Sequence, residues 1–329
     1  MKLLAAMKKR KSNTKSVGIP RALLYFSYYP FFQSFFRNLG AKVVISKKTD
    51  ADILERARKI TISEFCLPIK VFLGHIDYLK DRLNGQSDYI FIPSLIHSLE
   101  QDNKKYFCPK IIGSADIAKA TVQNSDESAD KKIKYLDLNF DDSHKYASIT
   151  EILLKVGMNI TSNPLKIYNA AKKARLAQEK HELLLKKGFY IDGERFIRIQ
   201  KGKKIGLIGH PYLIYDSFMN QNIVEKLDSS GYGVITQDNI TKIDSDAMRF
   251  HWSFANNMEN AFQTFAKASD VKGIIYLTPF GCSSDALVRQ HMVLEAKRLK
   301  KPFMILTYDE HTGEAGHDTR IEAFIDMLK

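Results

Sequence analysis

The sequence is poor in cysteine and tryptophan, and it has no long hydrophobic run. Its 329 residues include three cysteines, too few and too unevenly spaced for the disulfide framework of a small secreted protein. No apolar run reaches the roughly 18 residues that a membrane helix requires, and the N-terminal residues do not resemble a signal peptide. We therefore expect a globular, cytoplasmic protein without a membrane partner.

Basic side chains outnumber acidic ones. The sequence has 50 Lys and Arg and 37 Asp and Glu, which gives a net charge of +13. Residues 1–15 hold six of the basic side chains and no acid, which predicts a flexible basic arm. No winged-helix, zinc-finger or aromatic-ribbon signature accompanies this charge, so we do not expect a nucleic-acid partner. The remaining positive charge favours a polyanionic ligand such as a nucleotide or coenzyme A.

Two stretches, residues 16–46 and 204–236, resemble copies of one unit. Each consists of a short β run, a Pro-containing loop, an amphipathic helix, a Gly turn and a second β run. In the first copy, apolar residues recur at helical spacing before Gly40: Phe32, Phe35, Phe36 and Leu39. In the second copy, three residues recur in the same way before Gly231: Phe218, Ile223 and Leu227.

Further apolar strands are predicted at residues 88–95, 273–281 and 301–310. Strands that alternate with helices imply parallel sheets covered on both faces. A chain of this length suits two domains. The sequence therefore predicts two α/β domains of the flavodoxin-like or Rossmann-like type, at residues 16–160 and 201–329.

A long helix is predicted between the two domains, at residues 162–188, within a linking segment that covers residues 161–200. Ser162 or Asn163 can cap this helix, and Pro164 suits its first position. Gly188 can end it. The intervening stretch at residues 122–132 has no apolar periodicity and is interpreted as an exposed loop.

The three cysteines have a common setting, with a Phe within two residues and a Pro within three. Cys282 follows a predicted strand directly, Cys108 follows another strand by a loop, and Cys66 precedes a helix with Pro68 in its first turn. Active sites of open α/β sheets form beyond the carboxyl ends of the strands. We therefore expect the thiols to converge in the cleft between the domains. The alternative is that they are buried core residues.

Convergent thiolates select zinc, copper(I) or an iron–sulfur cluster. The Cys-x-x-Cys pairs typical of structural zinc are absent from the sequence. Iron–sulfur clusters usually take four cysteines, so three would leave one iron open to water or substrate. A different interpretation makes Cys282 a lone nucleophile beside a histidine.

Other polar side chains are candidate neighbours of the thiols. Lys70 can lie one helical turn from Cys66 and lower the pKa of that thiol. His75 can donate a hydrogen bond to a cluster sulfide. A solvated lysine and an ordinary helix-face histidine are the alternatives. We interpret His210 and His291 as structural.

Residues 308–320 follow a predicted strand and group four titratable side chains: His311, Glu314, His317 and Asp318. They could bind a metal, or form a substrate loop in which His311 or Glu314 carries a proton as a catalytic residue. The alternative is a strand-to-helix loop in which Asp318 or Thr319 caps the last helix.

The order of several short motifs resembles a known family. The motifs are GIPRALLYF, CLPIKVFLGH, CPK, PFGCSSD, DEHTGEAG and TRIEAF, and they run from about Val17 to the C-terminus. Together they are similar to the acyl-CoA dehydratase activase-related family, which belongs with the iron–sulfur component of 2-hydroxyacyl-CoA dehydratases and benzoyl-CoA reductases. The resemblance implies that Cys66, Cys108 and Cys282 hold an oxygen-sensitive 4Fe–4S cluster, or the double-cubane cluster of some relatives.

The resemblance also implies a reaction and partners. A separate ATP-dependent activator would supply an electron at low potential for radical dehydration or reduction of a small substrate, of which an acyl-CoA is the family example. The chain would then be a dehydratase-like lyase or a low-potential reductase component. It would work with a second cluster-bearing subunit or with a second copy of itself.

The activator ATPase is not part of this sequence, which has no acidic Gly-rich phosphate motif and no Walker A motif. The alternative function is therefore a non-catalytic protein of the same fold. Such a protein would carry electrons or clusters, or bind a nucleotide or coenzyme A.

Overall fold

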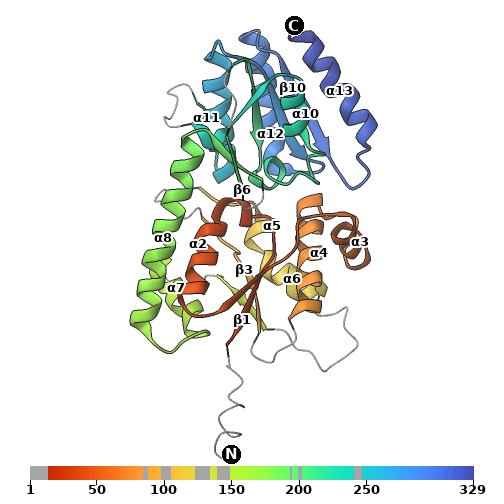
Figure 1. Cartoon of the computed structure of the whole chain (residues 1–329). Coiled ribbons are helices and arrows are strands. Elements are labelled where there is room, and N and C mark those ends of the chain that lie inside the picture. The colour runs from red at the N-terminus through yellow and green to blue at the C-terminus, as the bar shows by residue number, and fades with distance from the viewer. Residues whose placement is uncertain are drawn as a thin grey trace, which may run out of the picture.

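The computed structural model describes residues 14–83, 88–97, 105–122, 134–138, 149–192, 195–198, 202–240 and 247–329. The strands of these residues form two four-stranded sheets, one in each half of the molecule, and a small antiparallel hairpin (Figure 1). The first sheet contains β1 (Ser16–Ile19), β2 (Lys42–Ile45), β3 (Tyr89–Ile92) and β4 (Lys134–Asp137). The second contains β7 (Lys204–Gly209), β8 (Gly233–Thr236), β9 (Val271–Pro279) and β10 (Phe303–Tyr308).

The two sheets have the same topology. Their orders are β2-β1-β3-β4 and β8-β7-β9-β10, and every pair of neighbouring strands is parallel. In each half the second strand therefore lies beside the first, on the side away from the third. This is the arrangement of the first four strands of flavodoxin-like proteins, and it confirms the predicted α/β fold with two Rossmann- or flavodoxin-like domains.

Helices cover the sheets because the strands are apolar on both faces. In β9 every residue except Lys272 is buried. The first half contains α2 (Tyr25–Asn38), α3 (Ala51–Ile60), α4 (Leu67–Arg82), α5 (Pro109–Ile112), α6 (Ser114–Val122) and α7 (Ile149–Met158). The second half contains α9 (Pro211–Ile214), α10 (Ile223–Ser229), the 3-10 helix η2 (Gln237–Asn239), α11 (Ser253–Lys267), α12 (Ser283–Arg298) and α13 (Glu314–Met327). Among the described helices, none combines the length and apolar character needed to span a bilayer.

The core of the first half is aromatic. Phe32 and Phe36, one turn apart on α2, each place their ring 4.9 Å from the ring of Phe91 on β3. Edge-to-face pairs of this kind contribute about 1 kcal/mol each beyond the burial of their area. The predicted apolar face of this helix therefore packs on the sheet, and Gly40 follows the helix with a positive φ of 86°.

The long helix α8 (Pro164–Lys186) connects the two halves (Figure 1). The Asn163 side chain accepts a hydrogen bond from the Lys166 N–H at 3.1 Å, and Pro164 occupies the first turn. Gly188, with a φ of 86°, follows the helix end. These features confirm the predicted helix. The hairpin of β5 (Phe189–Asp192) and β6 (Arg195–Arg198), which the sequence reasoning did not predict, comes next.

The helix predicted in the second copy is shorter than expected. It is divided into α9 and α10, and Phe218 lies between them, 39% exposed. Gln221 and Asn222 both have positive φ values, 56° and 57°, which end any helix before Ile223. The predicted helix was therefore wrong at Phe218. Most of the basic arm and of the loop at residues 122–132 lies outside the described residues.

Direct contacts between the two halves include the following three. The backbone of Tyr106 accepts a hydrogen bond from Ser253 N at 2.8 Å and forms a β-bridge with Trp252. Lys70 Nζ lies 2.6 Å from Glu310 Oε2, and these side chains are only 7% and 21% exposed. The third contact is a buried polar chain, described below.

Candidate functional site

Each cysteine is the residue that precedes a helix. Cys66 precedes α4, Cys108 precedes α5 and Cys282 precedes α12. Cys66 and Cys108 share the same backbone conformation, with φ −66° and ψ 152°, and a proline follows in the first turn of each helix. The free N–H groups and the dipole at a helix N-terminus stabilise a thiolate. The three sulfurs therefore occupy similar positions, each at the N-terminal end of a helix.

Cys108 and Cys282 occupy equivalent places in the two halves. Each follows the third strand of its sheet, β3 or β9, and begins the next helix. Both therefore lie beyond the carboxyl ends of the strands, as predicted. At Cys282 the connection is tight, because Phe280 and Gly281 alone separate it from β9, and Gly281 has a φ of 70°.

The three thiols form no disulfide, and they act on one another electrostatically. Burial raises the pKa of the Cys66 thiol. The charge of Lys110 lowers this pKa, and the Cys282 and Cys108 thiols raise it further. Burial and then Cys282 raise the pKa of Cys108 in the same way. Burial also raises the pKa of the Tyr212 phenol far above its usual value, and all three thiols add to this. All three thiols therefore act electrostatically on one residue, Tyr212, which follows His210 by two positions.

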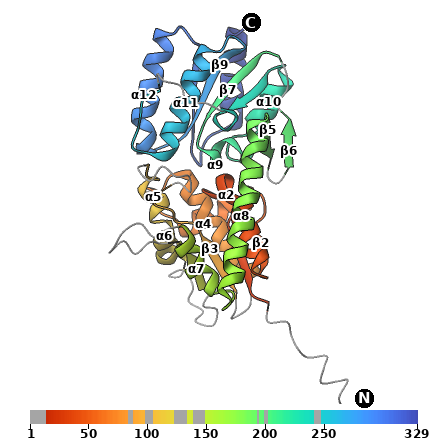
Figure 2. The same ribbon diagram turned by 90° about the vertical axis from the view of Figure 1, so that its left-hand side faces the viewer.

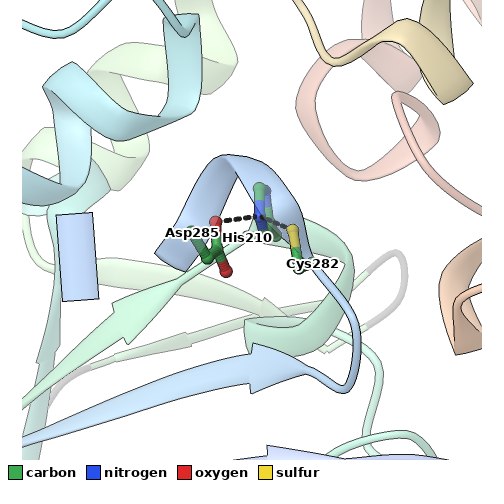
Figure 3. A group of neighbouring side chains, drawn as sticks. All are labelled: His210, Cys282 and Asp285. Carbon is green, nitrogen blue, oxygen red and sulfur yellow. Dashed lines mark hydrogen bonds and ion pairs between the residues drawn. The ribbon is translucent and has the colours of Figure 1, made fainter. Parts of the chain in front are cut away.

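His210 lies between Cys282 and Asp285 (Figure 3). It precedes α9, with Pro211 in the first turn, so it repeats the arrangement of Cys108 and its proline. His210 Nε2 is 2.8 Å from Asp285 Oδ1 and 3.8 Å from Cys282 Sγ. The Thr278 hydroxyl donates to the other carboxylate oxygen of Asp285 at 2.8 Å.

His210 and Asp285 form a buried ion pair, with both side chains 4% exposed. Burial lowers the pKa of His210, but the Asp285 carboxylate more than compensates and raises it to about 10. Burial opposes the charge on Asp285 as well, yet His210 lowers the pKa of that carboxyl. The pair therefore consists of an imidazolium and a carboxylate, and the Nδ1 atom of His210 has no hydrogen-bond partner.

This geometry does not fit a nucleophilic Cys-His-Asp triad. In such a triad the carboxylate holds Nδ1 while Nε2 takes the proton of the nucleophile. Here Asp285 and Cys282 both face Nε2 of His210. In the part of the chain that the structure describes, these three residues are the one group of His, Cys, Asp or Glu side chains whose ligand atoms could share a single metal ion, all within 4.8 Å of one another.

Aromatic side chains from both halves wall this region. The His210 ring stacks on Tyr212 with centroids 4.8 Å apart and an interplanar angle of 7°. Phe254 meets His210 edge-on at 5.1 Å and also contacts Phe107, the residue before Cys108, at 5.1 Å. All three aromatic side chains are buried, so the surroundings of His210 are apolar.

Lys70 and His75, predicted as neighbours of the thiols, have other partners. The ammonium group of Lys70 pairs with Glu310 of the second half. His75 is completely buried, and its Nε2 lies 3.1 Å from the Thr49 hydroxyl. Nine residues after Cys66, it is about 13 Å farther along the helix axis. The structure thus places His75 away from the thiols.

The His75 contact belongs to a buried polar chain between the halves. The Thr49 hydroxyl donates to Asp216 Oδ2, while Asp216 Oδ1 accepts from the N–H groups of Phe218 and Met219, both at 3.1 Å. Burial raises the pKa of Asp216 to about 6, although these hydrogen bonds oppose it. Burial lowers the pKa of His75 to about 3.

Replacing Asp216 by Asn is expected to change how stability depends on pH. Between the ordinary carboxyl pKa of 3.8 and about 6, the folded protein holds a proton on Asp216 that the unfolded chain has lost, so this group lowers stability as the pH rises. His75 acts oppositely, because below its ordinary pKa of 6.5 only the unfolded chain protonates it. In the Asp216→Asn variant, only His75 of these two groups still contributes to the pH dependence of stability.

We therefore expect the Asp216→Asn variant to lose more stability than the wild type when the pH is lowered from about 6 to about 4. The difference between the two losses in free energy of unfolding should reach up to about 3 kcal/mol. Urea unfolding across this range measures it. Asp228→Asn, at an exposed carboxyl of α10, is the control and should follow the wild type. Parallel pH profiles for Asp216→Asn and the wild type would contradict the assignment.

His311 and Glu314, the predicted catalytic candidates, lie at the surface, with side chains 80% and 70% exposed. Lys226 pairs with Glu314 at 3.4 Å and with Asp318 at 2.5 Å. The predicted cap at Asp318 or Thr319 was wrong, because α13 begins at Glu314. His317 is buried, and its Nε2 bonds the Tyr308 hydroxyl at 2.7 Å. The structure does not bring this group to the cysteines.

From the sequence, His210 was interpreted as structural, and Tyr212 and Asp285 were not identified. One signal was available, because the Gly-His-Pro turn that ends β7 has the same residue-before-proline pattern as Cys108. Asp285 carries no such signal, since an acid in the first turn of a helix is ordinary.

The comparison with protein families agrees with this architecture. The family model of the CoA enzyme activase uncharacterised domain (DUF2229) matches residues 16–240, about two thirds of the chain. This region contains Cys66, Cys108 and His210 and ends before Cys282. A search of curated proteins finds no match. The chain is therefore a member of the CoA enzyme activase domain family, as its motifs and their order had indicated.

Proposed function

We propose that this protein holds an iron–sulfur cluster, accepts low-potential electrons from a separate ATP-dependent activator, and supports the dehydration or reduction of a small substrate. One observation carries the proposal. Three cysteines that are far apart in the sequence lie within electrostatic reach of one another, each at the start of a helix. Membership of a CoA enzyme activase family supports both the activator and a CoA-linked substrate.

The residues at the site fit such a group. Their sulfurs are soft ligands, and the neighbouring carboxylate of Asp285 is already paired with His210. Burial keeps the Cys66 and Cys108 thiols protonated, so binding of iron would release their protons. Cys66, Cys108 and Cys282 would hold the cluster, which supplies one-electron transfer and keeps one iron free of a cysteine ligand.

The surrounding side chains have defined tasks in this proposal. Phe107, Phe254 and Tyr212 keep water from the sulfurs, which strengthens every electrostatic interaction there. His210 places an N–H group beside Cys282, and the ion pair with Asp285 fixes its ring. Hydrogen bonds near ligand sulfurs tune the reduction potential of a cluster. His210 is therefore a positioning residue for Cys282.

Anaerobic reconstitution with iron and sulfide tests the proposal. We expect a brown protein with about four irons per chain, an electron paramagnetic resonance signal after reduction, and reduction by a family activator only when ATP is present. A colourless protein without bound iron would overturn it. If the loaded protein is reduced but turns over no thioester in the presence of the activator, the carrier function replaces the enzymatic one.

A further inference from the structure

A groove of 380 Å³ lies between α2 and α8, which run side by side along the first half of the molecule (Figures 1 and 2). Buried Ala170 and Ala174 lie at the helix contact, and Ala177, on the same helix, lines the groove. The lining also includes seven other residues: Tyr29, Gln33, Ser34, Arg37, Lys180, His181 and Leu184. The volume is within the usual range of ligand pockets, about 300–1,000 Å³.

The charge of this groove has one sign. Its lining contains Arg37 and Lys180 and no carboxylate. The side chains of Gln33, Arg37 and Lys180 make no hydrogen bond or ion pair with any residue that the structure describes. Elsewhere on the same helix, Arg175 does pair with a carboxylate, Glu179, at 3.0 Å. The groove thus brings two cations and an amide from two helices together without a carboxylate in its lining.

The helix dipole explains the position of only one of the two cations. Arg37 lies in the last turn of α2, where the helix dipole favours a cation. Lys180 is in the interior of α8, six residues before its end, and gains nothing of this kind. Burial lowers the pKa of the adjoining His181 to about 4, so that ring is neutral and the positive charge belongs to the other two side chains.

We propose that this groove binds a phosphate-bearing small molecule of about the size of a nucleoside monophosphate. Arg37 offers a planar fork of N–H donors that matches two phosphate oxygens, and Lys180 adds a point charge. The amide of Gln33, one turn before Arg37, is a further donor. Pro30 and Leu184 provide apolar surface for the organic part of the ligand. The site shares no residue with the cysteine region.

Thermal unfolding of the full chain with inorganic phosphate, AMP or ATP, at constant ionic strength, tests this site. We expect at least one of them to raise Tm by about 5 °C at about 100 times its Kd. A response to inorganic phosphate identifies the anion as the recognised group, and a response to the nucleotides alone shows that the base and sugar contribute. Either result supports the proposal.

Matched variants locate the effect. The double variant R37Q/K180Q removes the charge, and Ala177→Leu fills the groove while the charge stays. Each should weaken binding at least about tenfold. Lys172→Gln, at an exposed lysine of α8 outside the groove, should bind like the wild type. No Tm change with any ligand, or a change that R37Q/K180Q and Ala177→Leu both retain, would overturn the proposal.

Discussion

Replacing Cys66, Cys108 or Cys282 by alanine is expected to reduce the iron content after anaerobic reconstitution from about four atoms per chain to less than about one. The chain has no other cysteine that could take over the position of the lost ligand. Two thiols cannot hold a cluster that already has one iron without a cysteine ligand. Iron and sulfide analysis, together with the visible absorption spectrum, measures the loss.

The control for this result is Ser284→Ala. The Ser284 hydroxyl is 3.3 Å from Cys282 Sγ, so the variant changes the surroundings of that sulfur and leaves the three thiols in place. Its iron content should equal that of the wild type. A cysteine variant that retains a full complement of iron would remove that cysteine from the ligand set. If all three variants retain it, the proposed function fails.

Replacing Asp285 by Asn is expected to lower the free energy of unfolding by about 3 kcal/mol. The change removes one charge of a pair whose side chains are both 4% exposed, and it leaves the imidazolium of His210 without its counter-charge. Removing one partner of a buried pair costs far more than the pair itself contributes, because the remaining charge stays desolvated. Urea unfolding followed by circular dichroism measures the effect.

Glu295→Gln is the matched control. Glu295 lies on the same helix, α12, and pairs with Arg298 at 2.6 Å, but the side chain of Arg298 is 66% exposed. Exposed pairs of this kind contribute about 0–1 kcal/mol, so the control should remain close to the wild type. Equal effects of the two substitutions would contradict the buried ion pair. The double variant D285N/H210Q should recover part of the loss, because no lone charge remains.

The alternation of strands and helices was predictable because it depends on local signals. The apolar strands around residues 89–92 and 273–277, the cap at Asn163 and the glycines at 40 and 231 each act within a few residues of themselves. The division of the helix near Phe218 was not predictable in this way. It depends on two successive residues with positive φ, Gln221 and Asn222, and neither is a glycine.

The candidate site was predictable to the same extent. Cys66, Cys108 and Cys282 have recognisable positions relative to strands and prolines, and that local pattern led to them. The neighbours of Cys282, His210 and Asp285, are 75 residues apart and meet only when β7 and α12 are assembled. Contacts of this kind leave no periodicity in a single sequence.

The candidate residues that were chosen because they lie near a cysteine or a strand end in the sequence do not lie at the site. His75 lies on the helix that Cys66 precedes, but its ring turns to Thr49 in the buried polar chain. His311 and Glu314 are neighbours of a strand end, yet their side chains face solvent. A helix has several faces and a loop has two sides, so proximity along the chain does not determine which partner a side chain meets.

The bridge between Tyr106 and Trp252 gives this protein an intrinsic optical probe. Trp252 is the sole tryptophan of the chain, and it lies where a loop of the first half pairs with the segment that begins α11. The emission wavelength of an indole depends on its exposure to water. Rotation of one half against the other, on docking of an activator or on uptake of iron, should therefore change the native fluorescence of the unlabelled protein.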